Sequence, residues 1–430
     1  MPTPSTRGGG TAGAAVAGVV LHPSSLPAVM PLTGLVLDHF CDAHDVSAAE
    51  NQDATLEFAY VTPAMVSKGQ DQWDWACVER MLKVMTERGR QAVLRLTDMT
   101  GTDMKAPAKL ALPDWLRKKG VETEEKGGWE YPLWDGGGDG TVGGPYSYEF
   151  FLHSFLKAAG EQLDEDPRVA FVQFGVGHWG EGHVFVGADE PLPVGTYFPN
   201  PCQYKHLIEV LRSSFKSARV QMGISVACAH YWGEDEQRRA EALEERGGTA
   251  GAAIGSFEDT FMGTVEEQKY NAGLLQILDE VPAEPPAGAR WHIAPRGGEI
   301  SYSKGCQEGA LVEVASDINL VAERHMTFAL AKGMWNPKKD AVTRRMVSAS
   351  FGYQFQVKLK GGHVHVTNVG VAPIYYPTHV EVGGVHLKGE NDLCGLLPGG
   401  SKTFKVAGLT GVLTLRCVRA ANPIPYNASA

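Results

Sequence analysis

The sequence has no long run of apolar residues and no cluster of basic residues. No stretch reaches the roughly 18 consecutive apolar residues that a membrane-spanning helix requires, so a transmembrane protein is not expected. The 39 Lys and Arg residues stand against 50 Asp and Glu residues, which gives a formal net charge of −11. Since binding to a phosphate backbone requires a basic surface, neither nucleic acid nor membrane is expected as a partner.

The cysteines are few and scattered. There are seven of them, with no C-x-x-C pair, so neither a redox motif nor a zinc ribbon is predicted and most should be buried thiols. The opening segment has no Leu-rich core and no clear cleavage site of the kind that a secretory signal contains. Residues 1–29 are therefore expected to form an N-terminal tail on a soluble protein, extracellular or cytoplasmic.

Strand-length apolar runs alternate with helical periodicity over residues 30–345, which is typical of repeated βα units. Eight such runs favour an α/β fold of the (β/α)₈ TIM-barrel type over a doubly wound open sheet, which usually has fewer strands. The predicted strands are Leu32–Leu37, Thr55–Val61, Gln91–Leu96, Val169–Phe174, Val220–Val226, Ala252–Phe257, Trp291–Ala294 and His325–Leu330.

The pattern changes after the predicted barrel. Residues 350–421 contain short alternating runs such as His363–Thr367 and Leu413–Cys417, separated by Gly, Pro and Asn. This is the pattern of an antiparallel β-sandwich, so a small C-terminal β-sandwich domain is predicted, followed by a tail over residues 422–430.

A long glycine-rich connection with six Trp and Tyr residues follows the third predicted strand, from Asp98 to about Tyr148. Because barrel active sites lie at the carboxyl ends of the strands, this loop is expected to hang over the site. Its rings, Trp134 among them, would suit the apolar faces of sugars. The alternative is that they only pack the loop onto the barrel.

The segment from Phe171 to His183 contains the most informative motif. Gly175, Gly177 and Gly180 spell G-x-G-x-x-G after a strand, but no helix follows, so a dinucleotide site is not supported. The same segment places Glu181 at the end of the fourth strand, beside aromatic and imidazole rings that favour a general acid. Zinc binding by His178, Glu181 and His183 lacks the i, i+4 His spacing of a helical site, so neither metal nor cofactor is predicted.

The second candidate carboxylate is Glu299, after the seventh predicted strand. Strands four and seven of one barrel can direct carboxylates at each other, as hydrolysis of a glycosidic bond by two carboxylates requires. Either Glu could instead be a structural acceptor for Arg95 or Arg296.

Further polar and aromatic side chains near the strand ends would bind the substrate, although some polar residues there cap the following helix instead. The predicted substrate-binding residues are Asp38, Arg95, Asp98, Trp134, His178, Trp179, His183, His230, Tyr231, Glu258, Asp259, Trp335 and Asn336.

Two sequence boxes carry a resemblance to a known family. Gly177-His-Trp-Gly-Glu-Gly-His183 and Asn368-Val-Gly-Val-Ala-Pro373 resemble the boxes of an uncharacterised family of glycoside-hydrolase-like barrels with a C-terminal sandwich. The resemblance implies a retaining enzyme with Glu181 as acid/base and Glu299 as nucleophile. Gly182 stands where that family often has Trp. Gly180 stands where the large glycosidase clan with catalytic carboxylates on strands four and seven has an Asn that binds the sugar 2-hydroxyl.

The leading hypothesis is therefore a hydrolase that acts on a poly- or oligosaccharide through Glu181 and Glu299. One alternative is a carbohydrate-binding pseudoenzyme that holds a glycan without cutting it. Another is a polysaccharide lyase, in which a His or Tyr side chain abstracts a proton next to a uronate carboxylate. The candidates for that base are His178, His183, His230 and Tyr231.

Overall fold

The computed structural model describes most of the chain. The described residues are 18–24, 28–39, 54–100, 109–134, 144, 146–186, 190–227, 253–280, 289–301, 315, 317–331, 341–387 and 392–429.

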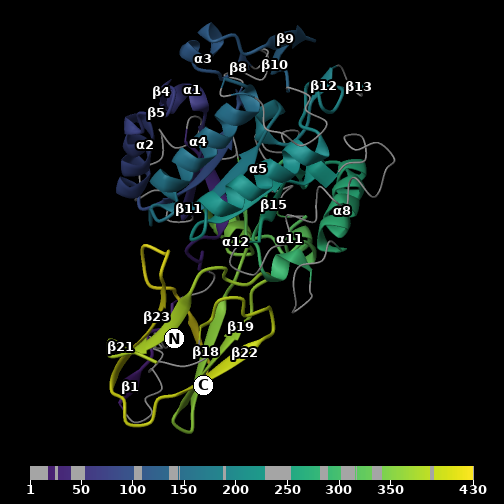
Figure 1. The fold of residues 1–430 in the computed structure, drawn as a ribbon. Coiled ribbons are helices and arrows are strands. Elements are labelled where there is room, and N and C mark those ends of the chain that lie inside the picture. The colour runs from purple at the N-terminus through teal and green to yellow at the C-terminus, as the bar shows by residue number, and fades with distance from the viewer. Residues whose placement is uncertain are drawn as a thin grey trace, which may run out of the picture.

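Eight parallel strands close into a barrel, in agreement with the predicted TIM-barrel fold (Figure 1). In the order in which they pair around the ring, they are β2 (Gly34–Asp38), β3 (Leu56–Val61), β6 (Gln91–Thr97), β11 (Val169–Gly175), β14 (Arg219–Gly223), β15 (Gly255–Phe261), β16 (Arg296–Ile300) and β17 (Phe328–Leu330). Seven of these overlap the predicted strands. Every residue of β2, β6 and β11 is buried, as expected for parallel strands covered on both sides.

The seventh strand was predicted wrongly. Trp291–Ala294 is not a strand: Arg290–His292 forms a 3₁₀ turn, and β16 begins only at Arg296. The strand is rich in glycine because its neighbours approach closely. A Cβ on Gly297 would lie 2.7 Å from the ring of Phe328, and one on Gly298 would lie 2.8 Å from Met326. Glu299 consequently lies within the strand rather than after it.

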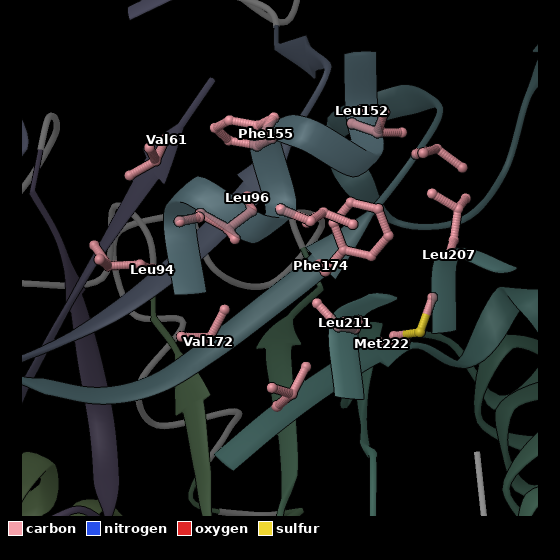
Figure 2. Packing of buried hydrophobic residues seen from close by; sticks show 14 of the residues in the cluster. Val61, Leu94, Leu96, Leu152, Phe155, Val172, Phe174, Leu207, Leu211 and Met222 are labelled. Atoms are coloured by element: carbon pink, nitrogen blue, oxygen red, sulfur yellow. The ribbon is translucent and has the colours of Figure 1, made fainter. Parts of the chain in front are cut away.

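Helices cover the barrel strands on the outside. They are α2 (Ala76–Glu87), α4 (Tyr148–Leu163), α5 (Pro201–Ser214), α8 (Val265–Glu280), α11 (Asn319–Glu323) and α12 (Ala341–Ser348). Ser147 caps α4 by accepting from the Phe150 amide, and Asn200 caps α5 with Gln203 in a capping box. Figure 2 shows the apolar side chains of α4 and α5 packed against the outward faces of the strands, with Phe155, Leu207 and Phe174 in one cluster.

The connection between β6 and α4 forms a small subdomain at one end of the barrel (Figure 1). It contains β7 (Met99–Thr100), β8 (Lys109–Leu110), α3 (Asp114–Lys118) and the hairpin of β9 (Thr123–Lys126) and β10 (Trp129–Pro132). Shorter elements elsewhere are α1 (Pro63–Val66), β4 (Ser67–Gly69), β5 (Gln72–Trp73), β12 (Phe185–Val186) and β13 (Glu190–Pro191).

Two four-stranded sheets form the C-terminal β-domain at the opposite end (Figure 1). Their strands are β18 (Phe355–Lys360), β19 (His363–Asn368), β20 (Thr378–Val382), β21 (Val385–His386), β22 (Ser401–Lys405), β23 (Gly411–Cys417), β24 (Asn427–Ser429) and, from the N-terminal region, β1 (Val19–Val20). The sheets share one hydrophobic cluster. They are not purely antiparallel, because β1 and β24, which we expected in tails, pair in parallel with β23 and β18.

The C-terminal β-domain packs on the barrel end that contains the amino ends of the strands. Val36, Phe58 and Phe328 of the barrel belong to the same hydrophobic cluster as the β-domain strands. The hydroxyl of Tyr376 also donates to the Ala170 carbonyl at the start of β11. This domain therefore lies away from the carboxyl ends of the strands. Among the described residues, no helix is long and apolar enough to cross a membrane.

Candidate active site

Glu181 lies on a tight turn that follows β11. A single 3₁₀ turn over His178–Gly180 precedes it, and the Glu181 amide donates to the His178 carbonyl at 2.9 Å. Trp179 has φ of +51°, a left-handed conformation that is costly for a bulky residue. This strained turn holds Glu181 at the carboxyl end of the barrel, as the sequence analysis expected.

The glycines of the G-x-G-x-x-G motif make this turn possible. A Cβ on Gly175 would lie 1.9 Å from the Gly180 carbonyl oxygen. Gly180 itself has φ of +73°, and its Cβ would lie 2.8 Å from Thr97 and 3.3 Å from Cδ of Arg95. The motif therefore serves close backbone packing, and the segment that follows it is not a long helix but a turn.

Replacing Gly180 by Ala tests this packing. Gly180→Ala should lower the free energy of unfolding by more than Gly120→Ala does, because Gly120 has φ of +87° but open space around its Cβ position. The backbone conformation alone should cost about 1–2 kcal/mol at both positions. Chemical denaturation of the two variants measures the difference. Equal losses would show that Thr97 and Arg95 do not confine Gly180.

Arg95 of β6 lies inside the barrel beneath the candidate catalytic residues and is 1% exposed. Its guanidinium carbon lies 4.3 to 5.6 Å from the ring centres of Phe58, Tyr60 and Phe257. Its Nε donates to Gln173 at 2.9 Å. The predicted substrate-binding role has little support from this position, because the side chain is enclosed. Arg95 is instead placed to orient its neighbours.

Glu181 and Glu299 approach the same nitrogen of Arg95. Nη1 lies 3.3 Å from Oε1 of Glu181 and 3.7 Å from Oε2 of Glu299, so these two oxygens are at most about 7 Å apart. That bound admits the separation of about 5–5.5 Å between the carboxyls of retaining glycosidases. The two side chains are 11% and 18% exposed, so solvent reaches both.

His183 joins Glu181 to a third carboxylate. Its Nε2 lies 3.1 Å from Oε2 of Glu181 and 3.8 Å from Oδ2 of Asp259 on β15. Burial lowers the pKa of His183, but the hydrogen bond to Glu181 and the charges of Glu181 and Asp259 outweigh it, so the pKa lies above its ordinary value. Burial and the nearby charge of Glu181 raise the pKa of Asp259.

The same three residues have the geometry of a candidate metal site. Ligand atoms of Glu181, His183 and Asp259 lie within 4.8 Å of one another. His178, the other histidine considered in the sequence analysis, is not in this group. The Arg95 guanidinium lies 3.3 Å from Glu181 and is a permanent cation that would oppose a divalent ion there.

His178 and Trp179 pack against the β9–β10 hairpin. The ring of His178 stacks on Trp129 at 3.7 Å, and its Nε2 lies 2.8 Å from the Tyr131 hydroxyl. Burial, with the charge of His183, lowers the pKa of His178 to about 3, so the ring is neutral near pH 7. Trp179 meets Trp129 edge to face at 5.0 Å, and both indoles are partly exposed. The hairpin thus supports the turn that carries Glu181.

Three predicted substrate-binding residues face away from the barrel interior. Asp98 is buried against the first turn of α4 and accepts from Tyr148; burial raises its pKa to about 7 despite this bond. Glu258 points outward, where it pairs with Arg324. Trp134 is 3% exposed and packs edge to face on Tyr148. In this structure their contacts are therefore internal, and these three predictions are corrected.

Asp38 is the last residue of β2 and is 3% exposed. Burial raises the pKa of Tyr60 well above its ordinary range, and the charges of Glu299, Glu181 and Asp38 act in the same direction. The charges of Asp38, Glu181 and Glu299 therefore all act on Tyr60. His230, Tyr231, Trp335 and Asn336 lie outside the described residues.

Sequence reasoning missed several residues of this site. Gln173 and Gln221 are buried, and a hydrogen bond of 3.2 Å joins them beneath Arg95. Each is a polar residue inside an otherwise apolar strand, which is a recognisable signal because buried amides require partners. Tyr60 was also missed, and only the fold brings it close to the site. Trp129 belongs to the aromatic loop whose rings the sequence analysis expected over the site.

Comparisons with known proteins give only distant structural matches. No family model matches the sequence, and no curated protein matches it. A family 39 glycoside hydrolase from Bacteroides cellulosilyticus WH2 has a TM-score of 0.45 and 10% identity, with 88% of this chain and 81% of that chain covered. Endo-glycoceramidase II from Rhodococcus sp. has a TM-score of 0.45 and 11% identity, with 93% of this chain and 98% of that chain covered. An endo-beta-1,4-glucanase from Xanthomonas axonopodis pv. citri has a TM-score of 0.39 and 10% identity, with 70% of this chain and 86% of that chain covered.

With TM-scores of 0.39 to 0.45, these matches carry no argument about the fold, the activity, the substrate or the site residues of this chain. The barrel is shown by its own closed ring of eight parallel strands. The functional assignment must therefore come from the geometry of the site.

Proposed function

We propose that this protein hydrolyses glycosidic bonds of a poly- or oligosaccharide by a retaining mechanism. The observation that carries the proposal is the approach of Glu181 and Glu299 to one nitrogen of Arg95, at 3.3 and 3.7 Å. Two carboxylates whose oxygens lie no more than about 7 Å apart, at the end of a barrel, are compatible with a double displacement.

Glu299 acts as the nucleophile in this mechanism. It attacks the anomeric carbon while Glu181 gives a proton to the leaving oxygen, and a water molecule then releases the sugar from Glu299 with Glu181 as base. Arg95 lies beside both carboxylates, fixes their relative positions and counters their mutual repulsion. Trp129 and Trp179, partly exposed beside Glu181, supply apolar faces against which neighbouring sugars can stack.

A product screen tests the proposal. Wild-type protein and a Glu181→Gln/Glu299→Gln double variant are incubated with a panel of oligosaccharides and polysaccharides, and products are identified by mass spectrometry. Hydrolysis products from the wild type alone are expected, with the configuration at the anomeric carbon retained in NMR spectra taken at early times. Binding without any product would support the pseudoenzyme, and an unsaturated product that absorbs ultraviolet light would support the lyase.

Activity should not depend on a bound divalent metal ion. The Arg95 guanidinium already lies beside Glu181, and the His183 nitrogen is shared between Glu181 and Asp259. Dialysis against a chelator is therefore expected to leave the hydrolysis rate within about twofold of its starting value, since no step of this mechanism uses a metal Lewis acid. Loss of the rate on dialysis, with recovery after addition of one divalent metal, would assign Glu181, His183 and Asp259 to a metal site instead.

A further inference from the structure

A second cavity lies between the barrel and the C-terminal β-domain, at the end of the barrel opposite the candidate active site. Its volume is about 440 Å³, which is within the range of small-molecule sites. The segments that lead into β11 and β14 line it on the barrel side. The segments before β20 and after β23 line it on the side of the β-domain. The cavity is therefore separate from the site that contains Glu181 and Glu299.

Three cations and one carboxylate line this cavity: Lys216, Arg219, Arg419 and Glu165. The whole chain has a formal net charge of −11, so this local excess of positive charge runs against the balance of the molecule. Among the described residues, Lys216 and Glu165 have no ion-pair partner, and both are exposed. The charge of the cavity is thus not cancelled by internal pairing of these two groups.

Arg419 is the buried cation of the cavity and is 6% exposed. Its Nε donates to the Val169 carbonyl at 2.8 Å, and its Nη2 donates to the Asp164 carbonyl at 2.9 Å. Within the part of the chain that the structure describes, Nη1 has no hydrogen-bond partner, and this atom is not enclosed. A guanidinium nitrogen carries two donors, so Nη1 can give both to a ligand.

Contacts between the two domains fix the walls of the cavity. The guanidinium carbons of Arg219 and Arg419 lie 5.3 and 5.7 Å from the ring centre of Tyr376. Nε of Arg219 donates to the Tyr375 carbonyl at 2.7 Å, and the Arg219 amide donates to the Tyr376 hydroxyl at 2.9 Å. Because these groups are already held in place, a ligand need not order them, which lowers the cost of binding.

The cavity also has apolar surface. Pro167, Pro377 and Val418 line it, and Val418 is 61% exposed. The space is much larger than an inorganic phosphate or sulfate ion. A ligand that fills it must therefore carry a carbon-containing part beside its charged group.

We propose that this cavity binds a small organic anion, with its carboxylate, phosphate or sulfate group held by Arg419 and Lys216. Charge-assisted hydrogen bonds from a guanidinium and an ammonium are among the strong contacts that an oxyanion makes. The Ser217 hydroxyl lines the same cavity and offers one more donor. Glu165 acts against the ligand, because like charges repel. This inference does not depend on the proposed function.

Calorimetric titration of the full chain tests the inference at fixed pH and ionic strength. The probes are glucuronate, glucose 6-phosphate and glucose 6-sulfate, with glucose and inorganic phosphate as controls. At least one organic anion should bind with a Kd of about 1 mM or lower, and both controls at least tenfold more weakly. The tightest of the three identifies the preferred charged group. Failure of all three to bind, or equal binding of inorganic phosphate, would overturn the inference.

Two substitutions on the exposed rim should change the affinity in opposite directions. Lys216→Gln should weaken binding of the organic anion by about tenfold, since a hydrogen bond to a charged group contributes about that much. Glu165→Gln should tighten binding several-fold, because it removes the repelling carboxylate. Lys358→Gln, on the exposed face of β18, is the control and should leave the affinity unchanged. Weaker binding in Glu165→Gln, or no change in Lys216→Gln, would contradict binding of an anion in this cavity.

Discussion

Glu299→Gln is expected to slow hydrolysis of every glycan substrate of this protein by at least 10⁴-fold, whatever the leaving group. The reason is that the amide cannot form the bond to the anomeric carbon on which the proposed double displacement depends. Glu181→Gln should instead discriminate between substrates. It should lose about 10² to 10⁴-fold on a poor leaving group and much less on a glycosyl fluoride, whose leaving group needs little protonation, because it removes only proton transfer from the first step.

The matched control for both variants is Glu209→Gln, on the exposed surface of α5. It removes one carboxylate without touching the barrel interior and should hydrolyse both substrates at the wild-type rate. Thermal unfolding should first establish that all three variants fold. Full activity of Glu299→Gln on any hydrolysed substrate would contradict its assignment as nucleophile, and equal losses in Glu181→Gln on both substrates would contradict the assignment of Glu181 as acid.

Arg95→Met should produce the largest loss of stability among the substitutions considered. Methionine keeps an unbranched apolar side chain among the three aromatic rings, but it leaves Glu181 and Glu299 without the cation that both approach. Breaking a buried ion pair in this way costs about 3–5 kcal/mol. The free energy of unfolding, measured in denaturant at pH 7, is the quantity to compare.

The variant Arg95→Lys distinguishes charge from packing. It keeps a cation near the two carboxylates while it changes the packing among the three rings, so it should lose less stability than Arg95→Met. Arg168→Met is the control, since Arg168 pairs with Glu79 at 2.9 Å on the outside of the barrel and its side chain is 30% exposed. It should cost about 1 kcal/mol or less. A loss of stability in Arg95→Lys as large as that in Arg95→Met would indicate lost packing instead.

The barrel could be predicted from the sequence because buried parallel strands are continuous apolar runs that alternate with helical periodicity. The seventh strand escaped this rule. Its real sequence, Arg296-Gly-Gly-Glu-Ile300, has no apolar run, and its glycines are required by contacts with Phe328 and Met326 from other segments. The preceding Trp291–Ala294 is more apolar but forms a turn. Contacts between segments distant in the sequence therefore determine which segment forms the seventh strand.

The sequence could predict that Glu181 and Glu299 lie close to each other, because strands four and seven end at the same side of any such barrel. It could not predict the direction of neighbouring side chains. Glu258 and Asp259 are adjacent on β15 and point to opposite faces, so an error of one residue in the strand exchanges their roles. Similarly, no local pattern reveals that Trp134 is enclosed. The alternative that Glu181 or Glu299 pairs with Arg95 was considered from the sequence, and in the structure Arg95 approaches both carboxylates.

The most direct test of the account is the hydrolysis rate of the Glu181→Gln/Glu299→Gln double variant beside the two single variants, on the glycan that the screen selects. If the two carboxylates act together in one reaction, the double variant should be no more than a few-fold slower than Glu299→Gln alone. The reason is that removing a second residue that acts in the same catalytic step reduces the rate little further. A double variant as active as the wild type would contradict the claim that this pair performs the reaction.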